Sequence, residues 1–221
     1  TEAQFDEIRG ILRVDLHRIH ASIENILQWS SGQIAAPRSS PGPFLLADAV
    51  GEAIGLLSVV AKDKGIVFDV HIPEDAAVVA DAGQLRAVLR NLLANAVKFS
   101  RRGGIVAVAS SLSQRAGNVE GAEWIVSVSD PGSGGVSGAA AVRRFLSDGE
   151  KAEPAWGTAG ERGFGLGLRL CRDFIEANGG MIGAEELPGG GTRVWVSVRA
   201  LLAVVGEADG AGGGSPTPAR T

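Results

Sequence analysis

The chain has 221 residues, of which 45% are hydrophobic, and a formal net charge of −4 from 21 Lys and Arg against 25 Asp and Glu. That apolar content is enough for a folded core, and the lack of a basic excess argues against a nucleic-acid partner. A single cysteine excludes an intrachain disulfide and a multi-cysteine metal site. No apolar run approaches the ~20 residues that span a bilayer, so we expect no direct membrane contact from this segment.

The first 34 residues are predicted to contain one long helix. Across residues 2–31, apolar side chains recur every three or four positions, which is the helical period. They are Ile8, Leu12, Leu16, Ile19, Ile23 and Ile26. Such a narrow seam is typical of helices that pair with other helices, so we expect it to have a partner. Residues 35–43 contain three prolines and are predicted to be a linker.

Residues 44–204 have the pattern of one globular domain. In chain order the pattern predicts a helix at 44–64, strands at 66–72 and 77–80, a helix from the N-cap Asp81 to Phe99, strands at 105–111 and 123–129, a short helix at 138–147, a helix at 166–177, and strands at 181–186 and 192–199. Because helices and strands occur in blocks, we predict an α+β fold with a layer of helices on one mixed sheet. We expect Cys171, Trp124 and Trp195 in the core, and residues 205–221 as a disordered tail.

The predicted helix at 81–99 carries an unusual pair of asparagines. Asn91 and Asn95 lie four residues apart, and Lys98 continues the same face. Asparagine is mildly unfavourable inside a helix, so two on one face need an explanation. An amide oxygen can coordinate Mg²⁺, and a lysine one turn further on can meet a phosphate. The alternative is an ordinary solvated helix face.

A carboxylate and two glycines end the predicted strand at 123–129. In the run Asp130-Pro-Gly132-Ser-Gly134, the carboxylate can accept a hydrogen bond from an exocyclic amino group. The glycines would let a ligand approach the backbone closely. The alternative is an ordinary turn.

A second glycine-rich run, Gly163-Phe-Gly165-Leu-Gly167-Leu168, leads into the helix at 166–177. Free backbone amides at a helix N-terminus can bind phosphate, so this run is a candidate phosphate-binding segment. The alternative interpretation is a flexible connector. Leu168 stands where the dinucleotide fingerprint has its third glycine, and the chain contains no Gly-Lys dipeptide. Neither that fingerprint nor a Walker P-loop is therefore present.

The order of these three segments resembles a known family. A helix containing N-L-L-A-N-A-V-K-F-S, a strand ending D-P-G-S-G, and G-F-G-L-G-L before a helix are similar to the catalytic ATP-binding domain of sensor histidine kinases. The segment from Asn178-Gly-Gly to Pro188-Gly-Gly-Gly-Thr192 resembles the end of such a domain. The resemblance covers about residues 44–200. It implies the Bergerat-type ATP-binding fold shared with DNA gyrase and heat-shock chaperones, a two-layer sandwich whose mixed, mostly antiparallel sheet is covered by helices on one face.

The resemblance also implies a site for ATP and Mg²⁺. By it, Asn95 ligates Mg²⁺, Asn91 assists from the same face and Lys98 reaches the phosphates, so that Asn91 and Lys98 are the implied catalytic residues. Asp130 accepts the amino hydrogen of adenine, and the glycines line the adenine and the triphosphate. The residues expected at the nucleotide are Asn91, Asn95, Lys98, Phe99, Asp130, Gly132, Gly134, Gly163, Gly165, Leu166, Gly167, Leu168 and Thr192.

The implied function is transfer of the ATP γ-phosphate to a histidine, which relays it to an aspartate on a response-regulator receiver domain. The family's phosphoacceptor box, a histidine followed by an acidic residue, is absent, because Arg18 follows His17 and Ala21 follows His20. We therefore expect the acceptor helix upstream of Thr1, in a longer polypeptide. The resemblance further implies a homodimeric parent protein and a cytoplasmic location for this segment.

Two other functions stay open. Gly135 replaces the aliphatic residue usual after D-x-G-x-G, and the stretch around Phe145 is a degenerate form of the family's Phe-containing box. These departures favour a non-catalytic nucleotide sensor or scaffold of the same fold. The third possibility is an ATPase of the gyrase or chaperone branch, against which the seam helix and the proline-rich linker argue.

Overall fold

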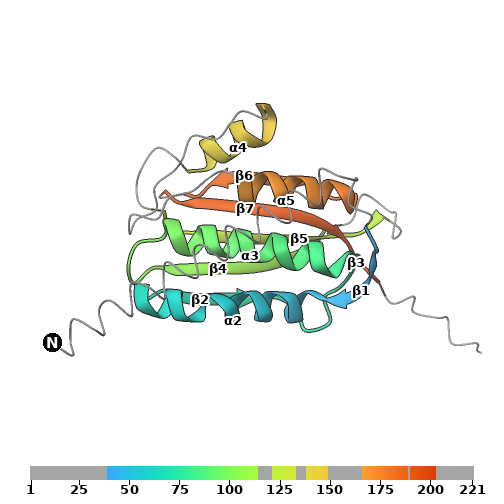
Figure 1. Cartoon of the computed structure of the whole chain (residues 1–221), viewed down its shortest axis with the longest axis horizontal. Helices are drawn as coiled ribbons and strands as arrows, with labels where there is room; N and C mark the ends of the chain where they lie inside the picture. Colours follow the sequence, from blue (N-terminus) through green and yellow to red (C-terminus); the bar gives the residue numbers. More distant parts are fainter. Residues whose placement is uncertain (1–38, 114–120, 133–137, 149–165, 189, 203–221) are drawn as a thin grey trace, which may run out of the picture.

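The computed structural model describes residues 39–113, 121–132, 138–148, 166–188 and 190–202, which form a sheet packed against helices (Figure 1). The main sheet of the described residues has five strands: β2 (Val67–His71), β4 (Ile105–Ser113), β5 (Glu123–Asp130), β6 (Ile182–Glu186) and β7 (Thr192–Arg199). Their order across the sheet is β2-β4-β5-β7-β6. β2 is parallel to β4, and the other neighbouring pairs are antiparallel. The predicted mixed, mostly antiparallel sheet is confirmed.

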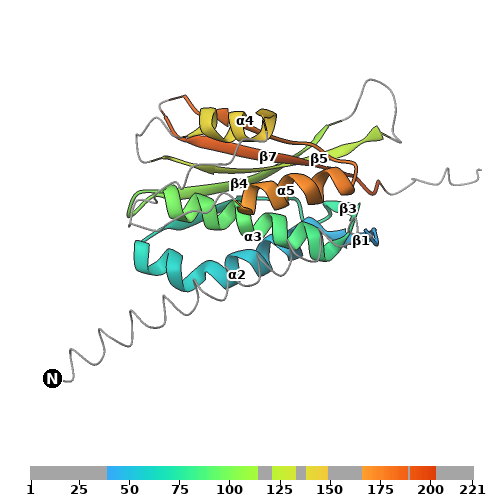
Figure 2. The same cartoon turned by 45° about the horizontal axis from the view of Figure 1, so that its top comes forward.

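In the described part of the chain, three helices cover one face of this sheet (Figure 2). They are α2 (Leu46–Lys64), α3 (Ala82–Phe99) and α5 (Leu166–Ala177). A shorter helix, α4 (Ala139–Asp148), lies beside the edge strand β6 (Figure 1). A two-stranded ribbon joins β1 (Gly42–Leu45) to β3 (Ala77–Ala80). None of the helices in the described ranges is long and apolar enough to cross a membrane.

α3 supplies the centre of the core, because its apolar side chains recur on one face of the helix. Its most deeply buried side chains, each at most 2% exposed, are Leu85, Val88, Leu89, Leu92, Leu93 and Val97. The sheet contributes alternate residues of its three middle strands to the same core: Val106, Val108, Val126, Val128, Val196 and Val198. Since side chains alternate across a strand, the intervening residues of these strands point to the uncovered face.

The predicted helices and strands within the described residues are present, with two differences. Phe44 is predicted to begin a helix, but it lies in β1, which pairs with β3 far along the chain and leaves α2 to begin at Leu46. Trp195, predicted in the core, points to the uncovered face, where its indole lies over Gly183. Cys171 is fully buried, as predicted, and burial raises the pKa of its thiol to about 12. The predicted N-terminal helix and the C-terminal tail lie outside the described residues.

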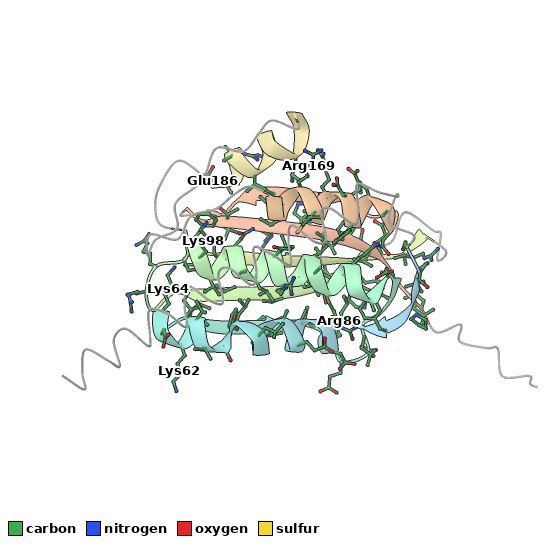
Figure 3. The ribbon with its side chains drawn as sticks, viewed as in Figure 1. Lys62, Lys64, Arg86, Lys98, Arg169 and Glu186 are labelled. Carbon is green, nitrogen blue, oxygen red and sulfur yellow. The ribbon has the colours of Figure 1, made fainter. Side chains whose placement is uncertain are left out.

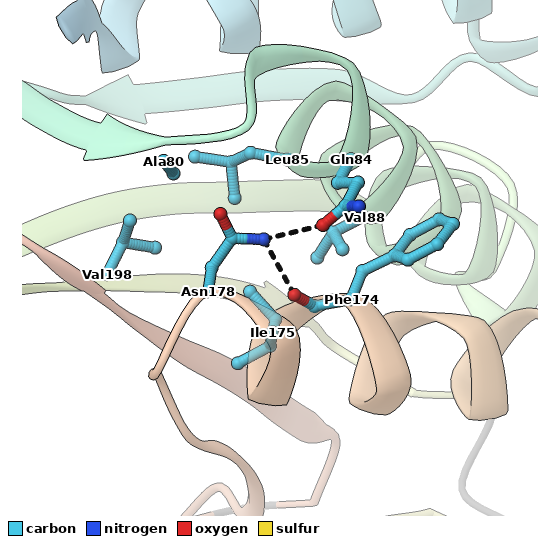
Figure 4. A pocket seen from close by; sticks show the side chains of 8 residues that line it. All are labelled: Ala80, Gln84, Leu85, Val88, Phe174, Ile175, Asn178 and Val198. Carbon is cyan, nitrogen blue, oxygen red and sulfur yellow. Dashed lines mark hydrogen bonds between the residues drawn. The ribbon is translucent and has the colours of Figure 1, made fainter. Parts of the chain in front are cut away.

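Asn178 joins the end of α5 to the start of α3 (Figure 4). Its Nδ2 donates to Gln84 Oε1 at 2.7 Å and to the Phe174 carbonyl oxygen at 2.8 Å. Its Oδ1 accepts from the Asp81 amide at 2.7 Å. Asp81 is the N-cap of α3, as predicted, since its Oδ1 accepts from the Gln84 amide at 2.9 Å. An apolar pocket adjoins this cluster and is lined by Ala80, Leu85, Val88, Phe174, Ile175 and Val198.

Replacing Asn178 with alanine should lower the free energy of unfolding by about 2 kcal/mol, because several polar groups at two helix ends lose their partners together. Chemical denaturation followed by circular dichroism measures the change. Glu176→Ala, at an exposed position two residues earlier in the last turn of α5, is the matched control and should alter stability by less than about 0.5 kcal/mol. Equal stability of the two variants would contradict the role given to Asn178.

Candidate functional site

The topology brings the ends of several elements to one side of the domain. β5 is antiparallel to β7, so Asp130, the last residue of β5, pairs with Thr192, the first residue of β7. Just beyond α3, Arg101 Nε donates to the carbonyl oxygen of Gly132 at 3.2 Å. The C-terminal end of α3, where Figure 3 labels Lys98, therefore lies next to the C-terminal end of β5.

Asp130 is a buried carboxylate at this junction. Its side chain is 8% exposed. It lies on the face of β5 that packs against the helices, the same face as Val126 and Val128, because every second residue of a strand points to the same side. Its Oδ1 accepts a hydrogen bond from the Gly132 amide at 2.8 Å. Burial raises the pKa of Asp130 to about 6, because the ionised form loses solvation. A carboxylate in such a setting is a strong acceptor for a donor on a ligand.

Two glycines bring the backbone close to Asp130 and Thr192. Gly191 has φ 100°, and a side chain there would collide with the carbonyl oxygen of Asp130. A Cβ on Gly138 would lie 2.7 Å from Thr192 Oγ1. Sequence reasoning assigned no role to either glycine. Gly191 belongs to the Gly-Gly-Gly-Thr run that carried part of the resemblance, whereas no local signal marks Gly138.

α3 and α5 lie antiparallel, which places the start of α5 beside the asparagine face of α3. The contacts pair Gln84 with Asn178, Val88 with Cys171, and Asn91 with Gly167. A Cβ on Gly167 would lie only 2.9 Å from Asn91 Oδ1, so glycine allows this close approach. The N-terminus of α5, the positive end of its dipole, therefore points toward the C-terminal end of α3.

The side chains on the last turns of α3 present both oxygen and cationic groups. Asn91 Nδ2 donates to the Ala87 carbonyl oxygen at 3.0 Å, which leaves Oδ1 directed toward the start of α5. Asn95 and Lys98, four and seven residues further on, share this face and are half-buried. Lys98 Nζ lies 4.9 Å from the centre of the Phe99 ring, within the range of a cation–π interaction.

Most of the predicted site residues that the structure describes lie at this end of the domain. They are Asn91, Asn95, Lys98 and Phe99 on α3, Asp130 and Gly132 after β5, Gly167 on α5 and Thr192 on β7. Leu168 is different because its side chain packs against the core, so only its backbone could face a ligand. Leu166 is the first residue of α5. Gly134, Gly163 and Gly165 lie outside the described residues.

The donor groups fit a magnesium nucleotide. Mg²⁺ keeps several waters and is usually bound by one or two protein oxygens together with substrate phosphates. The amide oxygens on α3 can supply such ligands, and among the described residues no group of three or more His, Cys, Asp or Glu could hold a metal ion instead. Lys98 and the amides at the start of α5 suit phosphate, and Asp130 suits an amino group.

A family model described as "Histidine kinase-, DNA gyrase B-, and HSP90-like ATPase" matches residues 80–201. The chain belongs to this family. The matched range is more than half of the chain and contains α3, β5, α5 and β7, the elements that build the site. The resemblance found in the sequence is thereby confirmed.

Curated relatives of this ATPase domain include sensor proteins and histidine kinases. Sensor protein GacS of Pseudomonas syringae pv. syringae is 31% identical over 201 residues, which cover 90% of this chain and 21% of GacS. Cell-division control histidine kinase PdhS of Brucella suis biovar 1 is 32% identical over 199 residues, which cover 86% of this chain and 18% of PdhS. The chain thus spans about a fifth of the length of these relatives and is a histidine-kinase-type ATPase domain. These relatives favour the histidine kinase branch over the gyrase or chaperone branch.

Solved structures of histidine kinases share the fold. Full-length ShkA, crystallised in complex with AMPPNP, matches with a TM-score of 0.61 at 25% identity, over 84% of this chain and 36% of ShkA. The catalytic domain of histidine kinase ThkA matches with a TM-score of 0.53 at 23% identity, over 72% of this chain and 95% of that domain. The predicted two-layer α+β fold is confirmed.

The raised pKa of Asp130 gives a pH-dependent stability. Its pKa of about 6 in the folded state lies above the value of 3.8 for the unfolded chain. Between pH 3.8 and pH 6 the folded state therefore binds more protons than the unfolded state, and the free energy of unfolding falls as the pH rises through this range. Asp130→Asn removes the buried charge and should stabilise the ATPase domain by about 2 kcal/mol at pH 7.5, a gain that shrinks toward zero at pH 4.

Thermal and urea unfolding across this pH range measures the effect. Asp75→Asn, which neutralises an exposed carboxylate, is the control and should show no comparable gain. A stability difference between Asp130→Asn and the unmodified protein that stays constant from pH 4 to pH 7.5 would contradict the assignment.

Proposed function

We propose that this ATPase domain binds Mg-ATP and transfers the γ-phosphate to a histidine of a sensor kinase. The observation that carries the proposal is the meeting of a buried carboxylate, an asparagine-bearing helix face and a helix N-terminus at one end of the domain. These features suit the base, the metal ion and the phosphates of a nucleotide. The complex of the similar protein ShkA with AMPPNP, an ATP analogue, supports the choice of nucleotide.

Asp130 would select the adenine base. Its carboxylate accepts a hydrogen bond from the exocyclic amino group of adenine, whereas guanine presents a carbonyl oxygen at that position and would be repelled. Phe99 offers an aromatic wall for the base, and Thr192 lies beside Asp130 as its partner in the β5–β7 pairing. Gly132 would leave space for the base next to the backbone, and the family resemblance gives Gly134 the same role.

The last turns of α3 and the start of α5 would hold the metal ion and the phosphates. Asn95 supplies an amide oxygen to Mg²⁺, and Asn91 assists from one turn earlier. When bound, Mg²⁺ neutralises charge on the triphosphate. Lys98 contacts the phosphates as a cation. The backbone amides of residues 166–168, at the positive end of α5, donate hydrogen bonds to them. Catalysis by these residues is mainly positioning and charge neutralisation, as in other phosphoryl transfers.

The phosphoacceptor would belong to a part of the parent kinase upstream of Thr1. We propose that residues 1–34 form one helix of a two-helix dimerisation hairpin, 35–43 a linker, 44–204 the catalytic domain and 205–221 a tail. The parent would be a homodimer whose catalytic part works in the cytoplasm and passes its phosphate to the receiver domain of a response regulator. The relatives, of which this chain spans about a fifth, are named as a sensor protein and a cell-division control histidine kinase, and these names support this arrangement.

A nucleotide sensor without kinase activity is the second candidate. It is favoured by Gly135, which stands where the family usually has an aliphatic residue. Both candidates bind ATP, so only phosphotransfer separates them.

Asn95→Ala should weaken Mg-ATP binding by about tenfold or more and abolish its dependence on Mg²⁺, because an amide ligand is lost while the buried face of α3 stays intact. Isothermal titration calorimetry with and without Mg²⁺ measures both effects. Arg86→Ala is the control. Arg86 lies nine residues, or two and a half helical turns, before Asn95 and is therefore on the opposite face of α3, where its Nε lies 2.7 Å from a carboxylate oxygen of Glu52. Unchanged affinity and Mg²⁺ dependence in Asn95→Ala would refute the metal assignment.

The present chain should not label itself with γ-phosphate from ATP, whereas the chain extended upstream by its hairpin partner helix should dimerise and become labelled. The label should be lost in acid and survive base, as expected of phosphate on an imidazole. Autoradiography after each treatment measures this. An extended chain that dimerises and binds ATP but never labels would establish the nucleotide-sensor candidate. Labelling of the present chain would point to His17 or His20, which His17→Gln and His20→Gln would tell apart.

A further inference from the structure

The C-terminal end of α3 lacks the usual glycine cap. Ser100 follows the helix in an extended conformation, with φ −68° and ψ 147°, and its amide donates to the Ala96 carbonyl oxygen at 2.9 Å. By contrast, α2 ends with Gly65 in the left-handed conformation at φ 68°, whose amide donates back to the last turn. The last carbonyl groups of a helix have no partner within the helix, so α3 needs one from elsewhere.

Lys64, the last residue of α2, supplies that partner. Its Nζ donates to the carbonyl oxygens of Val97 at 2.8 Å and Lys98 at 2.7 Å, and the residue is only 5% exposed. In Figure 3 Lys64 lies between α2 and α3, whereas Lys62 points away from the domain. A buried cation at the negative end of a helix dipole is in a favourable setting.

The segment that follows α3 also binds the end of α2. The Gly103 amide donates to the Lys64 carbonyl oxygen at 3.0 Å, and Arg102 donates from its guanidinium to the Asp63 carbonyl oxygen at 2.9 Å. The ends of α2 and α3 are therefore joined through both backbone and side-chain hydrogen bonds. Lys98 and Phe99, the residues that we place at the nucleotide, are the last two residues of this joined turn.

We propose that Lys64 is a positioning residue for the triphosphate: it holds the last turn of α3 so that the Lys98 ammonium faces the phosphates. The proposal rests on the nucleotide function proposed above and adds a residue that no part of that function used. We do not expect Lys64 itself to touch the ligand, because the residue is only 5% exposed and its Nζ donates to two carbonyl oxygens inside the domain. Its loss should therefore act through Lys98 and affect phosphate recognition more than base recognition.

Calorimetric titration of the whole chain with Mg-ATP and, separately, with adenosine tests this. Lys64→Met keeps the apolar stem but removes the donors. We expect Mg-ATP affinity to fall by about tenfold or more, since a charge-assisted contact is misplaced, and adenosine affinity to change by less than about twofold. Lys62→Met, which removes an exposed lysine two residues away, should leave both affinities unchanged.

The double variant Lys64→Met/Lys98→Met gives a second readout. If Lys64 acts through Lys98, the double variant binds Mg-ATP as weakly as Lys98→Met alone, and the two losses do not add. Fully additive losses, equal losses for ATP and adenosine, or a Lys64→Met chain that fails to fold would each overturn the proposal and leave Lys64 a purely structural role.

The outcomes for the unmodified chain keep the two proposals separate. An unmodified chain that binds neither Mg-ATP nor adenosine would refute the nucleotide function itself. An unmodified chain that binds Mg-ATP, together with a Lys64→Met chain of unchanged Mg-ATP affinity, would refute only the role of Lys64.

Discussion

The packing of α3 across the middle of the sheet constrains the rest of the candidate site. Burial of its leucine and valine face fixes the rotation of the helix about its axis. At 3.6 residues per turn, that rotation places Asn91 and Asn95 at the border of the buried face, with Asn91 beside the start of α5. Turning the helix by one residue would bury an amide or expose a leucine, and either change costs on the order of 1–3 kcal/mol. The core therefore sets the direction of the polar face.

Each end of α3 depends on a polar side chain from another helix. Asn178 of the α5 terminus binds the Asp81 amide and the Gln84 side chain at the start, and Lys64 of α2 binds two carbonyl oxygens at the end. The charges match the helix dipole, with the Asp81 carboxylate at the positive end and the Lys64 ammonium at the negative end. The helix that carries the asparagines and Lys98 is thus held at both ends by side chains that are distant in sequence.

The sheet places the carboxylate by register. Asp130 faces the helices because it stands an even number of residues from Val126 and Val128, and its pairing with Thr192 brings the start of β7 beside it. A slip of one residue would turn the carboxylate to the uncovered face, where burial would no longer raise its pKa. Gly191 keeps this register possible, since a side chain there would collide with the Asp130 backbone.

The sequence by itself predicted what depends on neighbouring residues. The helical and alternating periods located α3, α5 and the strands of the main sheet, and the Asp81 N-cap was recognisable because capping involves only three residues. The family resemblance indicated Asn91, Asn95, Lys98 and Asp130 as site residues through the order of their segments along the chain. Each segment alone was equally compatible with an ordinary helix face or turn. That resemblance is shown by the family match, while the roles of the residues remain predictions.

Only the tertiary structure decided the features that depend on distant partners. The local pattern around Phe44 predicts a helix, but pairing with β3 makes it a strand residue. The strand pattern around Trp195 does not tell which face of the sheet the helices cover, and Trp195 lies on the uncovered face. Lys62 and Lys64 are two lysines of one helix turn, with no local difference that would set them apart. Packing against the end of α3 buries one and leaves the other exposed, because only Lys64 can reach carbonyl groups that the helix itself leaves unpaired.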